Sequence, residues 1–451
     1  MTTRPPTDRA PSRHKHFFSH NSTRPAHRRA MVSYMRTIFL AAWIVFTSSD
    51  GSAAFAPASV SNLSQWSSRD RSGKSLACSK DDDVTAMHID RKTFVAKVAA
   101  TIVGVGSTSF APPTFAITAT SSPTTVNTDV RTLASLNKKS TTPVEVLSAL
   151  RRTHRAAPYA RSGNAIVTGG NTGIGLETVK ILACSGMNVI MCSRSVGKGL
   201  DARDTLPEEL RSKVSVQKLD LSNMQSVRDA TNDIRKNPFV AKGGLKGGGI
   251  DLIVNNAGVI DKKGDKQYSA QGLELTFAIN HVGHHMLTRD LLPSVNQGGR
   301  VTTVSSNAHG FANAEKAVAG ENGYCGSKLC NILFAKSLQD RLDSIGRSDV
   351  KSVSLHPGVI ATSIFDNTAG FWPLVALSPD RDTEQGASTT SLCSLADNEL
   401  IRGGEFYSNC SVTKPLTDAA IDARGELRER LWALTETTIA TKGFTLPATL
   451  A

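Results

Sequence analysis

The sequence predicts an α/β fold, with a doubly wound parallel sheet of about seven strands in a single domain. From Asn164 onward, short runs rich in β-branched residues alternate with segments of helical length, and a glycine-rich turn follows the first of them. Such alternation is typical of βαβ units, whose helices cover both faces of a parallel sheet. The expected strands are 165–168, 189–192, 214–219, 250–254, 300–304, 350–355 and 405–407.

The first expected strand leads into the glycine-rich turn 168–175, and a helix should begin near Ile174. The glycines permit a tight turn and a close approach of the backbone to a pyrophosphate, and the helix N-terminus offers N–H donors to it. The pattern favours a dinucleotide site of the Rossmann type over a purely structural turn. Its expected members are Gly169, Asn171, Thr172, Gly173, Ile174 and Gly175.

The end of the second expected strand indicates which dinucleotide binds. An acidic residue there would accept the ribose hydroxyls of NAD, but the strand ends in Cys192-Ser193-Arg194. Arg194 can pair with a 2′-phosphate through charge-assisted hydrogen bonds, and Lys198 can assist from the next helical turn. We therefore expect NADP(H); the alternative is a solvated Arg194 beside an unselective pocket.

Tyr324 and Lys328 are the candidate acid/base pair. They stand four residues apart on an expected helix, so both side chains lie on one face. A free tyrosine titrates near ~10. A nearby ammonium and the positive ring of a nicotinamide would lower that pKa toward the working range of a general acid. The spacing alone also fits a surface pair.

The sequence resembles the short-chain dehydrogenase/reductase family, with five motifs in order over residues 163–410, and three of them are the most distinctive. They are the Gly-x-x-x-Gly-x-Gly turn, Asn-Asn-Ala-Gly at 255–258 and Tyr-x-x-x-Lys at 324–328. The resemblance implies that Tyr324 gives a proton to a substrate oxygen and that Lys328 lowers the tyrosine pKa and binds the cofactor ribose.

The resemblance assigns two more catalytic residues. Ser306, at the end of the fifth expected strand, would position the substrate oxygen. Ser305 is the alternative, because only one of two successive strand residues faces the cofactor. Asn280 would hold a water that links the lysine to solvent.

The same resemblance implies further cofactor contacts at three loops. An aspartate after the third strand would contact the adenine, the turn after the fourth would lie against the adenosine, and the loop after the sixth would meet the nicotinamide amide. These residues are Asp220, Asn256, Ala257, Gly258, Pro357, Gly358 and Thr362, in addition to Tyr324 and Lys328.

Four strings, at 280–288, 304–309, 324–333 and 356–362, resemble the retinol-dehydrogenase-like branch, which includes plastid-envelope reductases. This implies NADP(H)-dependent interconversion of a carbonyl and an alcohol on a lipophilic small molecule that is retinal-like, steroid-like or pigment-derived. Two alternatives stay open: a pigment reductase similar to protochlorophyllide reductase, and an NADP(H)-sensing interaction protein of the plastid envelope. The substrate pocket should be apolar through Phe311, Phe365, Phe371, Trp372, Pro373 and Leu374.

Charge and cysteine content exclude other classes. The net charge is +13, but the first 162 residues carry all of this excess, so the folded part should present no basic surface for nucleic acid. The seven cysteines form no Cys-x-x-Cys pair, which fits a reducing compartment. Three histidines share one expected helix without a supporting ligand, so we expect helix packing or cofactor-pocket lining there rather than a metal site. They are His281, His284 and His285.

Residues 1–162 are expected to be a targeting presequence and linker. An apolar run at 38–46 has the length of a signal-peptide core, and Ala54-Phe-Ala-Pro57 with the Ser/Arg-rich stretch after it resembles a secondary-plastid presequence. We expect a plastid location; the alternative is the secretory pathway. A second apolar stretch at 94–119 leaves peripheral membrane association open, and one weak amphipathic helix is expected at 143–153.

The remaining chain divides into a catalytic domain, 163–435, and a C-terminal tail, 436–451. The family resemblance implies a homodimer or tetramer packed through the helices of Asn280 and Tyr324.

Overall fold

The computed structural model describes residues 132, 134–241, 248–260, 266–360, 364, 368 and 379–450. They form a sheet of eight strands in the order β3-β2-β1-β4-β5-β6-β7-β8. The first seven strands run parallel, and β8 is antiparallel to β7. The strands are β1 (Asn164–Thr168), β2 (Asn188–Ser193), β3 (Val214–Lys218), β4 (Ile250–Asn255), β5 (Val295–Val304), β6 (Lys351–His356), β7 (Phe406–Ser408) and β8 (Ser411–Val412).

All seven expected strands and their parallel arrangement are confirmed. The eighth strand was not expected, because its two residues are too short to show any alternation of apolar and polar side chains. It pairs with β7 across a two-residue turn in which Asn409 and Cys410 both have positive φ, 50° and 58°. Two such residues are characteristic of the tight hairpin turns that match the twist of adjacent strands.

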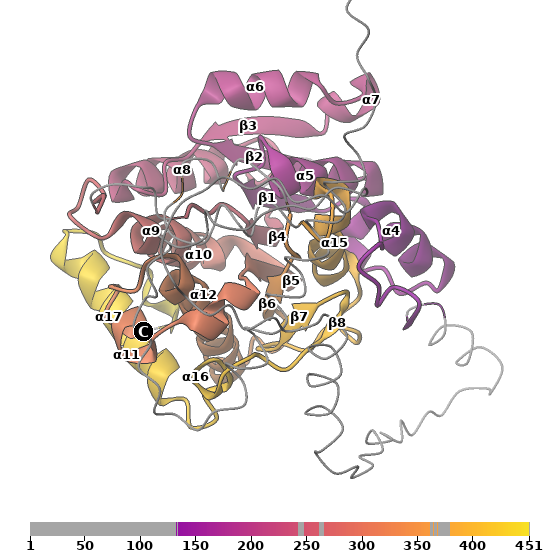
Figure 1. Ribbon diagram of the computed structural model, residues 1–451. Helices are drawn as coiled ribbons and strands as arrows, with labels where there is room; N and C mark the ends of the chain where they lie inside the picture. Colours follow the sequence, from indigo (N-terminus) through magenta and orange to yellow (C-terminus); the bar gives the residue numbers. More distant parts are fainter. Residues whose placement is uncertain are drawn as a thin grey trace, which may run out of the picture. The chain divides into compact units, whose positions relative to one another are not determined.

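Helices cover both faces of the sheet, as Figure 1 shows. Successive strand residues point to opposite faces. Ile166 and Ile190 therefore pack toward α8, α10 and α12, whereas Val167 and Met191 pack toward α4, α5 and α15. These helices are α4 (Pro143–Arg152), α5 (Gly173–Ser185), α8 (Met224–Lys236), α10 (Gly283–Leu291), α12 (Gly323–Ser344) and α15 (Ser388–Leu395). The others are α6 (Val196–Asp204), α7 (Glu208–Arg211), α9 (Leu275–Phe277), α11 (Ala314–Val318), α14 (Thr383–Gly386), α16 (Asp418–Ile421) and α17 (Glu426–Thr441).

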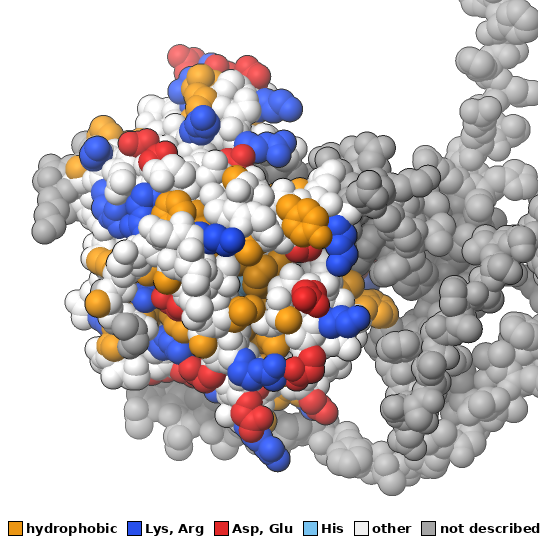
Figure 2. Space-filling view, turned by 90° about the vertical axis from the view of Figure 1, so that its left-hand side faces the viewer, with side chains coloured by type: hydrophobic (Ala, Val, Ile, Leu, Met, Phe, Trp, Pro, Cys, Tyr) orange, Lys and Arg blue, Asp and Glu red, His pale blue; other side chains and the backbone are white. Residues whose placement is uncertain are grey.

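The face of the molecule in Figure 2 carries basic and acidic side chains interspersed with apolar ones, without a continuous basic patch. Among the residues that the structure describes, no helix is long and apolar enough to cross a membrane. The predicted signal-peptide core, the Ala54-Phe-Ala-Pro57 junction and the second apolar stretch lie outside the described residues.

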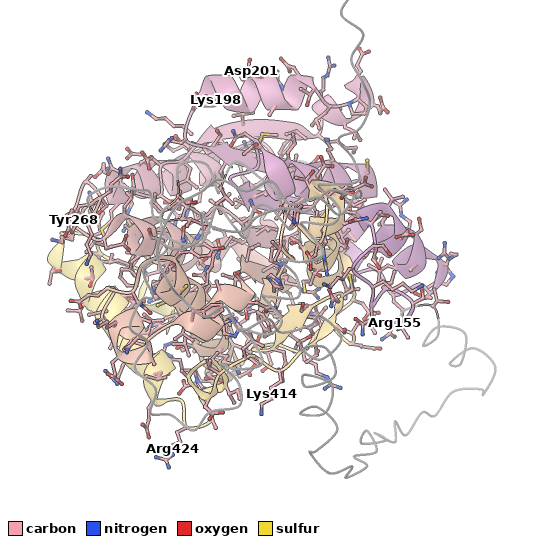
Figure 3. All side chains as sticks on the ribbon, in the orientation of Figure 1. Arg155, Lys198, Asp201, Tyr268, Lys414 and Arg424 are labelled. Atoms are coloured by element: carbon pink, nitrogen blue, oxygen red, sulfur yellow. The ribbon has the colours of Figure 1, made fainter. Side chains whose placement is uncertain are left out.

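The helix expected at 143–153 is confirmed as α4, but it belongs to the packed fold rather than to a linker. Thr142 caps it and exchanges hydrogen bonds with Glu145. Val146 and Leu150 are fully buried against α5 and α15, and Arg155, labelled in Figure 3, pairs with acidic residues after α15. α4 precedes the domain boundary expected at residue 163, and an amphipathic helix of this length gives only a weak signal until its apolar face finds a partner.

The expected tail from residue 436 is also part of the core. Glu436 lies inside α17, and Ile439 and Leu450 are buried in the same hydrophobic cluster as α10 and α12. Trp432 of α17 stacks on Phe334 of α12, with ring centroids 6.1 Å apart.

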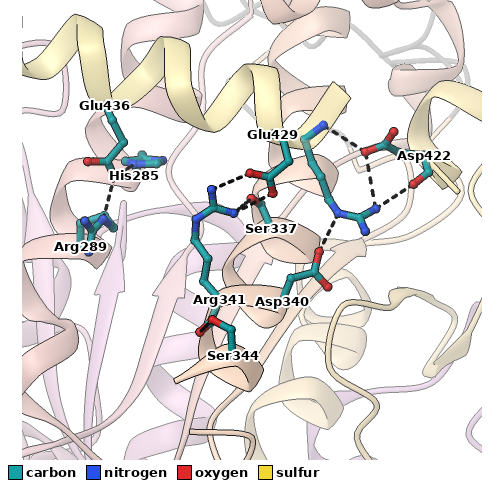
Figure 4. Close-up of polar contacts among 10 residues, drawn as sticks. His285, Arg289, Ser337, Asp340, Arg341, Ser344, Asp422, Glu429 and Glu436 are labelled. Carbon is teal, nitrogen blue, oxygen red and sulfur yellow. Dashed lines mark hydrogen bonds and ion pairs between the residues drawn. The ribbon is translucent and has the colours of Figure 1, made fainter. Parts of the chain in front are cut away.

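Ion pairs and hydrogen bonds connect α17 to α10 and α12 (Figure 4). His285 and Arg289 of α10 both bind Glu436, at 2.9 and 2.7 Å, and Arg341 of α12 binds Glu429 through two hydrogen bonds. Although burial opposes ionisation, the bonds from His285 and Arg289 lower the pKa of Glu436 to about 2. A helix of the same chain thus packs on α10 and α12, the helices through which the family resemblance implies a dimer or tetramer.

The packing of α4 can be tested with one substitution on each of its faces. Leu150→Ala should lower the free energy of unfolding by about 2–5 kcal/mol, because it leaves a cavity between α4 and the sheet helices. Val144→Ala, on the exposed face of the same helix, should change it by less than about 0.5 kcal/mol. Urea denaturation measures both, and equal stability of the two variants would show that α4 is not packed on the domain.

Candidate active site

The candidate site lies along the carboxyl edge of the sheet. Four strands end there in Thr168, Asn255, Val304 and His356, and β1 and β4 are neighbours at the point where the strand order reverses. Ligands of doubly wound sheets bind outside the strand ends at such a reversal. The expected site residues come from the loops and helices that follow these strand ends.

The turn after β1 has the shape that a pyrophosphate requires. Gly169 and Gly173 have positive φ, 62° and 55°, and a Cβ at Gly175 would lie 2.1 Å from the carbonyl oxygen of Gly169. Thr172 precedes α5 with an extended backbone, its side chain does not cap the helix, and no acidic residue occupies the first turn. The first N–H groups of α5 are therefore open to an anion, and the turn fits a dinucleotide phosphate.

Thr168 joins this turn to the Asn-Asn-Ala-Gly turn after β4. Its hydroxyl oxygen accepts hydrogen bonds from the backbone N–H groups of Asn256 and Ala257, both at 2.9 Å. The Asn256 side chain returns a bond of 2.9 Å to the Thr168 carbonyl. The expected residue Asn256 thus holds the two turns together, and the buried Thr168 was missed because threonine at a strand end carries no specific signal.

The residues expected to contact the 2′-phosphate and the adenine follow strands β2 and β3. Arg194 follows β2 directly and is exposed, and Lys198 is exposed on α6, where Figure 3 labels it. Neither forms an ion pair within the part of the chain that the structure describes. Asp220 uses one carboxylate oxygen to accept both the N–H and the hydroxyl of Ser222, which fixes the loop after β3.

Tyr324 and Lys328 lie in the first turns of α12 and are buried, 8% and 3% exposed. A surface pair is therefore excluded. The Lys328 Nζ stands 5.4 Å from the centre of the Tyr324 ring. Burial raises the pKa of Tyr324, and its hydrogen bond with Ser306 opposes that rise only in part. In the protein alone the pKa of Tyr324 is therefore raised by burial rather than lowered as expected, and Tyr324 is held protonated.

The Lys328 ammonium sits against the Asn-Asn-Ala-Gly turn after β4. Its Nζ donates a 3.0 Å hydrogen bond to the carbonyl of Val304, and burial lowers the pKa of Lys328 to about 8. A Cβ at Gly258 would lie 3.3 Å from this Nζ and 3.5 Å from the side-chain oxygen of Asn280. Because Gly258 has no side chain, the space beside the ammonium stays open. Three expected residues, Gly258, Asn280 and Lys328, therefore lie close together.

Asn280 lies in a π-helical turn, η4 (Ala278–Val282), where Gly283 N–H bonds to a carbonyl five residues back. Such turns occur frequently at functional sites. The Asn280 amide exchanges two bonds with the backbone of Val259, at 2.8 and 2.9 Å, and donates a third to Ser327 at 2.9 Å. Asn280 thereby ties the turn after β4 to α12.

The geometry separates the two candidate serines. Ser306 bonds to Tyr324 and caps the short helix η6 (Asn307–Phe311). Ser305 instead points into the fold and donates a 2.6 Å hydrogen bond to the backbone carbonyl of Lys328. His309 fixes the segment after Ser306, because its Nδ1 binds the Ser306 carbonyl and its Nε2 accepts from Leu416 N–H.

The loop after β6 brings Pro357 and Gly358 to the same edge of the sheet. Gly358 has a φ of 105°, and the Pro357 carbonyl accepts a hydrogen bond from Arg381. Asp380 accepts from Val359 N–H and pairs with Lys139, from the segment before α4. Sequence reasoning missed Arg381 and Asp380, which show no motif spacing.

Several expected positions lie outside the described residues. They are Thr362 and the pocket residues Phe365, Phe371, Trp372, Pro373 and Leu374.

His281, His284 and His285 are all buried. Among the described residues, no group of His, Cys, Asp or Glu side chains converges as metal ligands.

Known proteins with similar sequences identify the family of this chain. The family model for short chain dehydrogenases covers residues 163–370. Retinol dehydrogenase 11 of Mus musculus is 34% identical over 282 residues, which span 59% of this chain and 83% of that relative. The chain belongs to the short-chain dehydrogenase family. It is accordingly an oxidoreductase in a family that acts on carbonyls and alcohols.

Two further similarities complete the comparison. Short-chain dehydrogenase TIC 32 A, chloroplastic, of Brassica napus is 31% identical over 294 residues, which span 60% of this chain and 87% of that relative. The expected branch, retinol-dehydrogenase-like and plastid-envelope reductase-like, is thereby confirmed. A solved structure of an uncharacterised Mycobacterium paratuberculosis protein is 28% identical, with a TM-score of 0.48, over 63% of this chain and 96% of that one.

Buried histidines in this short-chain dehydrogenase should make its stability depend on pH. Burial lowers the pKa of His284 to about 4 and that of His356 to about 3. Both pKa values lie below that of an unfolded histidine, so the unfolded chain binds more protons as the pH falls below about 6.5. The free energy of unfolding should fall by roughly 1 kcal/mol per such histidine between pH 6.5 and 5.5.

Urea denaturation at the two pH values measures this loss. His356→Asn should reduce the loss, whereas His154→Asn, at an exposed position, should leave it unchanged. The same pH dependence in both variants would contradict the assignment.

Proposed function

We propose that this short-chain dehydrogenase uses NADP(H) to interconvert a carbonyl and an alcohol on an apolar small molecule. The observation that carries the proposal is the buried Tyr324, which is bonded to Ser306 and lies one helical turn from Lys328, whose ammonium sits beside Gly258 in the turn after β4. A proton donor (Tyr324), a hydroxyl that can bind the substrate oxygen (Ser306) and a cation (Lys328) thus lie together beside the proposed dinucleotide site.

Each residue has a distinct task. The bound nicotinamide supplies or accepts the hydride. Ser306 orients the substrate oxygen through its hydroxyl, and Tyr324, protonated because of its burial, gives its proton to that oxygen in the direction of reduction. Lys328 stabilises the resulting tyrosinate and holds the ribose hydroxyls. Asn280 keeps α12 at a fixed position against the turn after β4.

The preference for NADP(H) over NAD(H) rests on Arg194. It is exposed at the end of β2, the position where an acidic residue would select NAD, and it has no acidic partner among the described residues. Lys198, also exposed on α6, adds a second positive charge within the same loop and helix. A 2′-phosphate placed here gains charge-assisted hydrogen bonds.

An apolar substrate is favoured by the surroundings of Tyr324. Its ring packs with Ile260 and Ala308, and Cys325 and Ile364 complete this small cluster. Phe311, on the segment that follows Ser306, is half exposed. A polar substrate would leave its own groups unpaired against these side chains.

Two relatives carry chloroplastic names, which with the order of the leader motifs supports a plastid location over the secretory pathway. Within the plastid, an NADP(H)-sensing interaction protein of the envelope is the second candidate function, and a pigment reductase is the third. Retention of the buried Tyr324 and Lys328 favours catalysis over sensing alone.

Tyr324→Phe in the full chain should lower the turnover of NADPH with carbonyl substrates by about 10²-fold or more, because the proton donor is lost. The NADPH dissociation constant should stay within about threefold, since the ring remains. A panel of retinal-like, steroid-like and pigment-derived carbonyls supplies the substrates. Tyr268→Phe, which removes an exposed hydroxyl, is the matched control.

Normal turnover by the Tyr324 variant would refute the assignment of the proton donor. Binding of NADPH by the unaltered chain without oxidation by any member of the panel would favour the sensing function.

Arg194→Ser should weaken binding of NADP⁺ by about 10-fold or more while binding of NAD⁺ changes little, because one charge-assisted bond is worth about 1.5–3 kcal/mol. Calorimetric titration of both nucleotides measures the ratio. Arg203→Ser, on α6 but paired with Asp204, should leave the ratio unchanged, and an unchanged ratio in the Arg194 variant would refute the proposed selectivity.

A further inference from the structure

His284 is a buried histidine that the mechanism above does not use. It is 1% exposed and lies in the first turn of α10. Its Nδ1 stands 3.0 Å from the backbone carbonyl oxygen of Asn280, and its Nε2 stands 2.8 Å from the hydroxyl of Thr168. One imidazole therefore spans from the cofactor turn to the helix that carries Asn280.

The hydrogen positions in this chain of contacts follow from the chemistry of the groups. A carbonyl oxygen only accepts, so the proton of the neutral ring must be on Nδ1, which leaves Nε2 as an acceptor. The Thr168 hydroxyl then donates to Nε2 at 2.8 Å, because its other acceptor, the Val254 carbonyl, is farther away at 3.4 Å. Its oxygen is free to accept the N–H groups of Asn256 and Ala257, as the distances of 2.9 Å require.

The surroundings of His284 favour the neutral form of its ring. Burial lowers the pKa of His284 to about 4; the bond to the Asn280 carbonyl opposes this shift, and the charge of Lys328 adds to it. A protonated ring would aim a second N–H at Thr168, whose oxygen already accepts two donors. The neutral Nδ1–H ring therefore satisfies all of these contacts at once.

We propose that His284 is a positioning residue that locks the cofactor turn to the catalytic helices through its neutral Nδ1–H form. The path runs from the turns around Thr168, through the imidazole, to Asn280, whose amide binds Ser327 next to Lys328. His284 thus sets the distance between the bound cofactor and the acid/base pair. This inference rests on the proposed function only in the part that concerns turnover.

His281 provides the matched control, because it is buried equally and lies on the same helical stretch. Its Nε2 binds Thr435 of α17 at 3.0 Å. The Thr435 hydroxyl donates to the Leu431 carbonyl, so His281 must donate from Nε2 and has the opposite tautomer. Its replacement disturbs the packing on α17 without touching the cofactor turn.

The experiment compares His284→Leu, His284→Asn and His281→Leu in the full chain, with NADPH and retinal as probes. His284→Leu should lower kcat by at least tenfold and weaken NADPH binding by about threefold or more, since both ends of the bridge are lost. His284→Asn keeps a donor near the Nδ1 position and should recover part of kcat. His281→Leu should lower the melting temperature to a similar extent while kcat stays within about twofold.

Equal losses of kcat in the two leucine variants, or an asparagine variant no better than leucine, would overturn the positioning role. Failure of the unaltered chain to reduce retinal or any other carbonyl of the panel would count against the proposed function instead.

A second measurement requires no variant to fold and no substrate. Nitrogen NMR of the histidine-labelled chain distinguishes the two neutral tautomers, and the inference requires Nδ1–H for His284 at pH 7. An Nε2–H form, or a protonated ring, would overturn it.

Discussion

The site depends on one buried charge, the ammonium of Lys328. It is 3% exposed and forms no ion pair with any carboxylate of the described residues. Its Nζ donates a hydrogen bond to the Val304 carbonyl. A buried cation without a counterion costs free energy, and burial accordingly lowers the pKa of Lys328 to about 8. Its surroundings must therefore be fixed by the fold. Gly258 leaves the space beside it open, and Asn280 and Ser327 fix the helix that carries it.

The elements added at the two ends of the chain support this arrangement from outside. The segment with α4 packs on α15 and reaches the loop after β6 through the pair of Lys139 and Asp380. At the other end, α17 covers α10 and α12, and Glu436 binds two side chains of α10. α12, which carries Tyr324 and Lys328, and α10, which follows Asn280, are thus held by contacts within one chain.

The sequence predicted the sheet, the glycine-rich turn and the pairing of Tyr324 with Lys328 because each depends on local spacing. The signals are alternating strands and helices, glycines in a tight turn, and residues four apart on a helix. It could not predict the packing of α4 and α17, since amphipathic helices reveal no partner. It also missed Thr168 and His284, whose roles come from hydrogen bonds between residues far apart in the chain. The rise in the pKa of Tyr324 depends on burial, which spacing alone does not reveal.

The most direct test of the account is the titration of Lys328 itself. Nitrogen NMR of the lysine-labelled chain, with the Lys328 signal identified by its loss in Lys328→Met, follows the Nζ as the pH rises. The account predicts a pKa near 8 for Lys328. A value near ~10.4, that of a solvated lysine, would show that the ammonium is not buried beside the cofactor turn and would contradict the account.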